Sequence, residues 1–185
     1  MIEIDDVEQA MERVEGVAEQ TPLRHSRTVS EATCADVHLK YENLQRTGSF
    51  KIRGAYNKMS SLSDEEREAG VITASAGNHA QGVALAANEV GIDTKILMPK
   101  DAAISKVEAT SEYGGDKVEI VLHGIDYDDA YDEAREVGDE EGRVFVHPFD
   151  DPYVQAGQGT VGLEILDELP EVDTIIVAVG GGGLA

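Results

Sequence analysis

Short apolar runs alternate with helix-patterned segments along most of this 185-residue chain, and the alternation restricts the fold more than any other feature. The runs predicted as strands are residues 37–41, 71–74, 94–98, 118–122, 144–146 and 174–179. The helical segments predicted among them are residues 52–59, 78–90, 104–113, 127–137 and 154–169. Strands joined through helices pair in parallel, because the connection is too long for a hairpin. The sequence therefore predicts a doubly wound α/β fold, with functional groups at the carboxyl ends of its strands.

Local signals mark several helix ends. Ser63 followed by Glu66 is a capping box, in which each side chain accepts a hydrogen bond from a backbone N–H of the other residue. Gly70 and Gly91 follow helical stretches and are predicted as C-terminal caps.

The charge balance is strongly acidic, with 37 acidic and 15 basic residues and a net charge of −22. A field of this sign repels nucleic acids and anionic membranes, so neither is expected as a partner. The acidic residues are spread along the helices instead of forming a tail, which favours a protein from a salt-loving host.

Other features indicate a cytoplasmic protein. No apolar run is long enough to span a membrane, and the first residues lack the basic and apolar regions of a secretory signal. The single cysteine, Cys34, cannot form an internal disulfide and is expected to be a small buried or half-buried side chain.

Residues 47–55 place Lys51 between a turn and the start of a helix. A lysine near a helix start is usually a solvated charge. Beside Phe50, however, the amine can be partly removed from water, which lowers its pKa and makes it a better nucleophile and base.

Residues 75–81 lie where a predicted strand turns into a helix. Gly77 permits a tight turn, Asn78 can direct its amide into a cleft, and the free N–H groups of the helix start attract a carboxylate. The alternative is a capped helix start in which Ser75 or Asn78 has no further role. His79 is expected to be structural and not a proton carrier.

Four glycines, residues 180–183, follow the predicted strand 174–179. Successive glycines let backbone N–H groups surround a phosphate without a cationic side chain. The pattern is neither a Walker loop nor the spaced GxGxxG of dinucleotide-binding folds. A flexible tail is the alternative, although the apolar strand before the glycines favours a ligand-binding turn.

His147 beside Pro148 could indicate a metal ligand or a base, but no second ligand stands at zinc spacing. We expect this segment and residues 157–160 to shape the cleft, and we expect no metal site. An amine nucleophile, a helix start that attracts anions and a phosphate-binding turn are together what a pyridoxal phosphate enzyme needs.

The chain resembles the serine/threonine dehydratase family, the fold-type II pyridoxal phosphate enzymes, over nearly its whole length. The matching segments, in order and spacing, are residues 49–55, 73–82, 147–150, 157–160 and 180–184. The resemblance implies a fold like that of tryptophan synthase β, with a small lobe over 49–151 and an incomplete large lobe from 1–48 and 152–185. It also implies pyridoxal 5′-phosphate as cofactor, a small amino acid as substrate, and a homo-oligomer for the complete protein.

The same resemblance assigns roles to residues. Lys51 would carry the cofactor, Phe50 would pack beside its ring, and Asn78 would bond its phenolic oxygen. The residues expected at the phosphate are Gly180, Gly181, Gly182, Gly183 and Leu184. The residues expected at the substrate carboxylate are Ser75, Ala76, Gly77, Asn78 and His79.

The implied reaction is β-elimination from L-threonine, and from L-serine, to 2-oxobutanoate or pyruvate and ammonia, with a role in isoleucine biosynthesis. Serine racemases of the family carry a second serine at the position of Ala76, and a methyl group cannot deliver a proton to the carbanion. Elimination is therefore favoured over racemisation. The preference for threonine over serine is weaker, because one methyl group is worth about 1–3 kcal/mol. A racemase, a sibling β-lyase and a non-catalytic remnant are the alternatives.

The end of the chain suggests a longer protein. A buried strand at 174–179 needs neighbours on both faces. By the resemblance, the rest of the large lobe and the group that faces the pyridine nitrogen follow the glycine turn. We expect this chain to be an N-terminal fragment.

Overall fold

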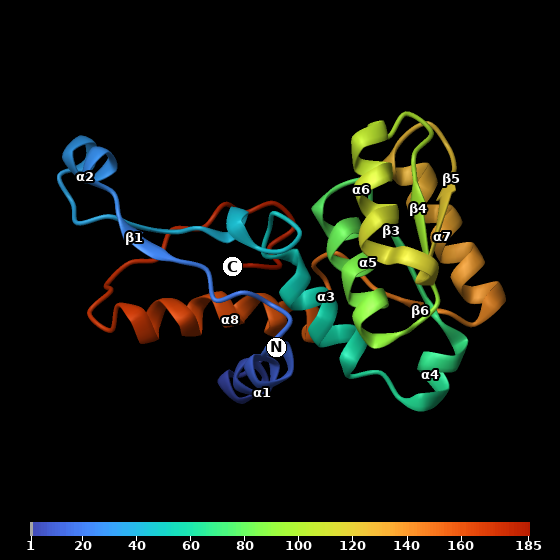
Figure 1. The fold of residues 1–185 in the computed structure, drawn as a ribbon, viewed down its shortest axis with the longest axis horizontal. Coiled ribbons are helices and arrows are strands. Elements are labelled where there is room, and N and C mark those ends of the chain that lie inside the picture. Colours follow the sequence, from blue (N-terminus) through green and yellow to red (C-terminus); the bar gives the residue numbers. More distant parts are fainter. Residues whose placement is uncertain (1) are drawn as a thin grey trace.

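The computed structural model describes residues 2–185, in which α3 lies between a four-stranded sheet with its helices and a second group of elements that includes α1 and α8 (Figure 1). The helices are α1 Ile4–Val14, α2 Arg27–Thr33, α3 Lys51–Ser60, α4 Asp64–Ala69, α5 Asn78–Val90, α6 Ile104–Gly114, α7 Tyr127–Glu141 and α8 Pro152–Glu168. The strands are β1 Leu23–His25, β2 His38–Lys40, β3 Val71–Ala74, β4 Thr94–Met98, β5 Val118–Leu122 and β6 Val144–Phe145. Two short 3₁₀ turns are η1 Glu42–Leu44 and η2 Gly115–Lys117.

The larger sheet is parallel, with the strand order β5-β4-β3-β6. Helices α5 and α6 cover one face and α7 covers the other (Figure 1). Every residue of the central strand β3 is buried, as expected for a parallel strand that is covered on both faces. The predicted α/β fold with a parallel sheet is confirmed.

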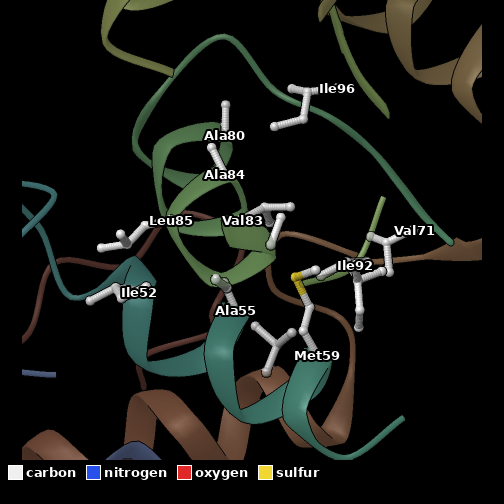
Figure 2. Close-up of a cluster of buried hydrophobic side chains, with 14 of the residues drawn as sticks. Ile52, Ala55, Met59, Val71, Ala80, Val83, Ala84, Leu85, Ile92 and Ile96 are labelled. Carbon is white, nitrogen blue, oxygen red and sulfur yellow. The ribbon is translucent and has the colours of Figure 1, made fainter. Parts of the chain in front are cut away.

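Alternate residues of the central strands enter different apolar clusters. Val71 and Ile96 pack with α3 and α5, where Met59 and Val83 fill the space between helix and sheet (Figure 2). The next residues along the same strands, Ile72 and Leu97, pack instead against α7. This period of two is the reason why short, continuously apolar runs form strands here.

The predicted bounds of β3, β4, β5 and α5 are confirmed. The capping box is present, since Ser63 Oγ accepts from Glu66 N at 3.2 Å and Glu66 Oε2 accepts from Ser63 N at 2.8 Å. Gly70 and Gly91 are the C-caps of α4 and α5, and both have positive φ angles. These signals are local, so they could be read without knowledge of the fold.

Three expectations were wrong. The strand near 37–41 does not join the parallel sheet; β2 pairs antiparallel with β1, a short strand that the apolar pattern did not reveal. Residues 174–179 form no strand, and Ile176 is 91% exposed, because no described segment supplies hydrogen bonds to this backbone. Cys34 is exposed, since it is the left-handed C-cap of α2, a helix with no buried residue.

Helix α3 is fixed by very close contact with both neighbouring helices. A Cβ atom at Gly157 of α8 would lie 2.6 Å from the carbonyl oxygen of Arg53, and a Cβ atom at Gly82 of α5 would lie 2.9 Å from the carbonyl carbon of Lys51. Only glycine permits these backbones to approach so closely. A Cβ atom at Gly54 of α3 would likewise lie 2.6 Å from the carbonyl oxygen of Val154 in α8, so the position of α3 relative to α5 and α8 depends on these three glycines.

A buried ionic network holds the same helix. The guanidinium of Arg53 is completely buried and donates to Glu42 at 2.9 Å through both Nε and Nη2. It also donates to both oxygens of Glu164, at 2.6 and 3.0 Å. Burial alone would lower the pKa of Arg53, but the hydrogen bonds and charges of the two carboxylates raise it above its ordinary value. Lys40 adds a further ion pair to Glu164 at 2.7 Å.

The helices of residues 2–185 include none that combines the length and the apolar character needed to cross a membrane.

Candidate active site

A cavity of about 530 Å³ opens where the carboxyl ends of β3 and β6 meet the first residues of α3, α5 and α7. The residues that line it are Lys51, Ser75, Asn78, His79, Tyr127, Asp128, Tyr131, His147, Pro148 and Phe149. The structure thus brings Lys51 together with the segment 75–79 and with the loop that follows β6. These segments lie far apart in the sequence, and the edge of the parallel sheet gathers them, as expected for a doubly wound fold.

Lys51 is the first residue of α3, and its side chain is partly buried. Its Nζ donates a hydrogen bond to the carbonyl oxygen of Pro148 at 2.7 Å and lies 5.4 Å from the ring centroid of Phe50. Burial lowers the pKa of the Lys51 amine. A larger fraction of the neutral amine is available for nucleophilic attack than at a solvated lysine.

The start of α5 offers free backbone donors to the cavity. Gly77 is the N-cap and has no side chain with which to cap the helix, and the first turn contains no acidic residue. Ser75 Oγ accepts from the Gly77 N–H at 3.2 Å, so it does not occupy the amides further along α5. The alternative of a side-chain-capped helix start is not what the geometry shows, and this helix terminus can attract an anion.

One hydrogen bond at an exposed position orients the amide of Asn78. Its Oδ1 accepts a hydrogen bond from Lys106 Nζ at 3.3 Å. A lysine ammonium can only donate, so the oxygen of the Asn78 amide faces Lys106 and the NH₂ group is left to donate elsewhere.

His79 is buried, and its Nε2 lies 3.2 Å from the carbonyl oxygen of Val146. The oxygen can only accept, so Nε2 carries the proton. Burial, together with the charge of Lys51, lowers the pKa of His79 to about 3 despite this hydrogen bond. The ring therefore stays neutral near pH 7, as expected for a structural histidine. Its Nδ1 is buried without a partner among the described residues.

Aromatic rings gather around His147, which lines the cavity. The chain has three phenylalanines and six tyrosines, and Tyr131, Phe145 and Phe149 meet the imidazole of His147 at centroid distances of 6.2, 6.2 and 4.6 Å. Tyr127 stands next to Tyr131 at 5.9 Å. The sequence patterns did not indicate Tyr127, Asp128 and Tyr131 as site residues. Two tyrosines four residues apart at the start of a helix that follows a strand were the available signal.

The glycine turn, residues 180–183, lies against Phe149. A Cβ atom at Gly183 would lie 2.7 Å from the Cβ of Phe149, and one at Gly181 would overlap the Phe149 ring. Gly182 adopts a φ of +84°. Residues 180–184 do not line the cavity themselves, and neither do Phe50, Ala76 and Gly77. The turn packs against Phe149, and Phe149 lines the cavity.

Residues 14–185 match a family described as pyridoxal-phosphate dependent enzymes. The chain belongs to this family. It is 52% identical over 184 residues to an L-threonine ammonia-lyase of Thermotoga maritima. The matched segment covers all of this chain and 45% of that relative. It is 51% identical to the catabolic L-threonine dehydratase TdcB of Escherichia coli K12, over 99% of this chain and 55% of the relative.

Solved structures of similar proteins have the same fold as this chain. Maize serine racemase superposes with a TM-score of 0.93 at 40% identity, over 99% of this chain and 55% of that protein. The processed threonine deaminase isoform 2 of Solanum lycopersicum superposes with a TM-score of 0.89 at 43% identity, over 98% of this chain and 51% of that protein. The chain thus spans about half the length of the relatives it matches, and its fold is the fold-type II fold.

The family implies pyridoxal phosphate, and the residues present fit this group. A partly buried amine shares one cavity with a helix start that has free N–H groups, and the glycine turn packs against Phe149, which lines the same cavity. Among the residues that the structure describes, no three His, Cys, Asp or Glu side chains are placed to hold a metal ion.

Proposed function

We propose that the protein carrying this chain eliminates water and ammonia from L-threonine, and from L-serine, with pyridoxal phosphate as cofactor. The products are 2-oxobutanoate or pyruvate. The observation that carries the proposal is the partly buried amine of Lys51 in one cavity with Ser75, Asn78 and His79. Similarity to threonine ammonia-lyases at about half of all positions supports this substrate class.

Lys51 would bond the aldehyde carbon of the cofactor and, once released, take the proton from Cα of the substrate. Its lowered pKa suits both tasks, because each requires the neutral amine at Nζ. Pro148 O would orient Nζ, since it holds that atom at 2.7 Å. Pyridoxal phosphate, when bound, supplies the electron sink that makes loss of the Cα proton possible.

The start of α5 would bind the substrate carboxylate through its free N–H groups. Asn78 would donate its NH₂ group to the phenolic oxygen of the cofactor, because Lys106 already occupies its carbonyl oxygen. Glycines 180–183 would surround the phosphate, with Phe149 packed against the turn. Phe50 would pack beside the cofactor ring.

We further propose that residues 49–151 are the small lobe and that 1–48 and 152–185 belong to the large lobe. Helix α3 would then lie where the lobes meet, which agrees with its packing between α5 and α8. The elements of the second group, α1, β1, β2 and α8, lie together away from the four-stranded sheet (Figure 1).

Racemisation is the second candidate, because maize serine racemase has so similar a fold. It requires a proton donor on the opposite face of the carbanion. Ala76 has a methyl group at the position where, by the family resemblance, racemases carry a serine. This residue favours elimination, and Ala76→Ser is expected to raise the ratio of racemisation to elimination.

The test begins with a visible absorption spectrum of the 185-residue chain after addition of pyridoxal phosphate, before and after borohydride reduction. Lys51→Ala is the test variant and Lys58→Ala, on the same helix, is the matched control. We expect a visible band, and we expect reduction to attach the cofactor covalently to the peptide that contains Lys51. The band should be lost in Lys51→Ala and kept in Lys58→Ala. Release of 2-oxobutanoate from threonine by the full-length protein is then measured.

Absence of the band would leave the family assignment in place and identify the 185-residue chain as a non-catalytic remnant. A band that persists in Lys51→Ala would remove Lys51 from its proposed role.

A further inference from the structure

His147 lines the cavity, and the proposed function has so far given it no chemical role. Its position is well defined. The N–H groups of Asp150 and Phe149 lie 2.8 and 3.3 Å from its Nδ1, and its ring stands edge-on to that of Phe149 at 4.6 Å. In the loop 147–150 the imidazole thus accepts backbone hydrogen bonds from residues further along the chain, as an Asn or Asp side chain does in an Asx turn.

These two contacts fix the tautomer. Backbone N–H groups can only donate, so Nδ1 accepts and carries no proton. In the neutral ring the proton is then on Nε2. This N–H has no hydrogen-bond partner within residues 2–185, whereas the N–H of the other lining histidine, His79, is used by Val146 O.

The charge state agrees with this geometry. Partial burial lowers the pKa of His147, and the charges of Arg135 and Lys51 act in the same direction, against the opposing effect of Asp150 and Asp151. Near neutral pH the ring is a neutral hydrogen-bond donor and not a cation.

The position of His147 relative to Lys51 suggests which group it meets. The carbonyl oxygen of Pro148, the next residue, accepts a hydrogen bond from Lys51 Nζ at 2.7 Å. A substrate that reacts at Nζ therefore lies beside the loop that contains His147. The proposed function already assigns the substrate carboxylate to the start of α5. It also assigns the phenolic oxygen of the cofactor to Asn78 and the phosphate to the glycine turn. The polar substrate group without a protein partner is the hydroxyl on Cβ.

We propose that His147 binds the β-hydroxyl oxygen of the substrate through its Nε2–H. The inference rests on the proposed function and deepens it, because it names the residue that would distinguish hydroxy amino acids from other substrates. A neutral imidazole donates a hydrogen bond but is too weak an acid to give up its proton, so His147 orients the leaving oxygen and does not act as its general acid.

Two substitutions separate the donor from the turn. His147→Asn keeps an acceptor at the place of Nδ1, and with it the turn to Asp150 N and Phe149 N, but it is too short to donate from the place of Nε2. His147→Gln has the opposite properties, since its amide reaches the place of Nε2 and abandons the turn. If the donor matters, Gln retains more activity than Asn; if only the turn matters, the order is reversed.

The measurement is kcat/KM of the full-length, cofactor-loaded protein for L-threonine, L-serine and β-chloro-L-alanine, whose chloride leaves without a hydrogen-bond donor. In His147→Asn we expect a loss of about tenfold to a hundredfold for the two hydroxy amino acids, and a value for β-chloro-L-alanine close to wild type. Equal losses on all three substrates, or no loss on any, would overturn the role of His147 while elimination by the wild type upholds the proposed function. A wild type that eliminates from none of the three overturns both.

A second readout does not depend on activity. The ¹⁵N resonances of the His147 imidazole in the cofactor-free protein should show a protonated Nε2 and an unprotonated Nδ1 near neutral pH, with assignment by loss of the signals in His147→Asn. A protonated Nδ1 would contradict the proposal.

Discussion

Gly82 lies directly against the backbone of Lys51. A Cβ atom at Gly82 would stand 2.9 Å from the carbonyl carbon of Lys51 and 3.0 Å from its carbonyl oxygen. Gly82 is one turn after Asn78 on α5, so this contact sets the distance between the amine and the start of α5. Two parts of the cavity that are distant in sequence are thus held together by the absence of one side chain.

The contact predicts the effect of Gly82→Ala. The methyl group must displace the backbone of Lys51, because the atoms it meets cannot rotate away. We expect the affinity for pyridoxal phosphate to fall about tenfold to a hundredfold, at a cost of about 1–3 kcal/mol in the free energy of unfolding. Absorbance titration and urea unfolding measure the two quantities.

The matched control is Gly162→Ala. Gly162 is a helical glycine of α8, and nothing lies within 4 Å of a Cβ atom there. It should leave cofactor affinity unchanged and stabilise α8 by up to about 1 kcal/mol. Equal behaviour of the two variants would show that the contact between Gly82 and Lys51 has no effect.

The ionic network predicts a large effect at Arg53. Arg53→Met leaves the carboxylates of Glu42 and Glu164 without their bidentate partner in a buried environment. We expect a loss of about 3–5 kcal/mol in the free energy of unfolding. Arg46→Met removes an ion pair to Glu89 that is as short, 2.6 Å, but is a single contact at a partly exposed site. That control should cost no more than about 1 kcal/mol, and urea unfolding of both variants compares them. A small loss in Arg53→Met would mean that water reaches the network.

The lowered pKa of His79 predicts how the free energy of unfolding depends on pH. Its pKa is lowered from 6.5 to about 3 in the folded chain, so between these values the unfolded chain binds more protons. The free energy of unfolding therefore falls as pH decreases from 6.5 towards 3, by about 1.4 kcal/mol per pH unit from this group alone. In His79→Leu that part of the slope should disappear.

Thr73→Val is the control for His79, because Thr73 Oγ1 donates to the same Val146 oxygen at 2.8 Å and does not titrate. It should lower the free energy of unfolding by a similar amount at every pH. Urea unfolding at several pH values measures the free energy of unfolding of both variants. If His79→Leu keeps the pH dependence of the unmodified chain, His79 is not its cause.

The strands of the parallel sheet were predictable because their signals are local. β3, β4 and β5 are short apolar runs between helix caps such as Gly70 and Gly91. The start of α3 at Lys51 was predictable for the same reason. Residues 174–179 have an equally apolar pattern and yet form no strand, since a strand also needs a partner that accepts and donates its hydrogen bonds.

The sequence by itself determined the parallel α/β class and the candidate active-site segments around Lys51 and Asn78. The order of these segments also indicated the family to which the chain belongs. These depend on periodicity, turn residues and motif spacing, which are properties of neighbouring residues. Only the tertiary structure decided that Tyr127 and Tyr131 line one cavity with Lys51 and that Arg53 joins Glu42 to Glu164. It also decided that backbone N–H groups fix the tautomer of His147. Such relations join segments that meet only when the sheet is assembled, because burial and hydrogen-bond partners are set by distances in space and not along the chain.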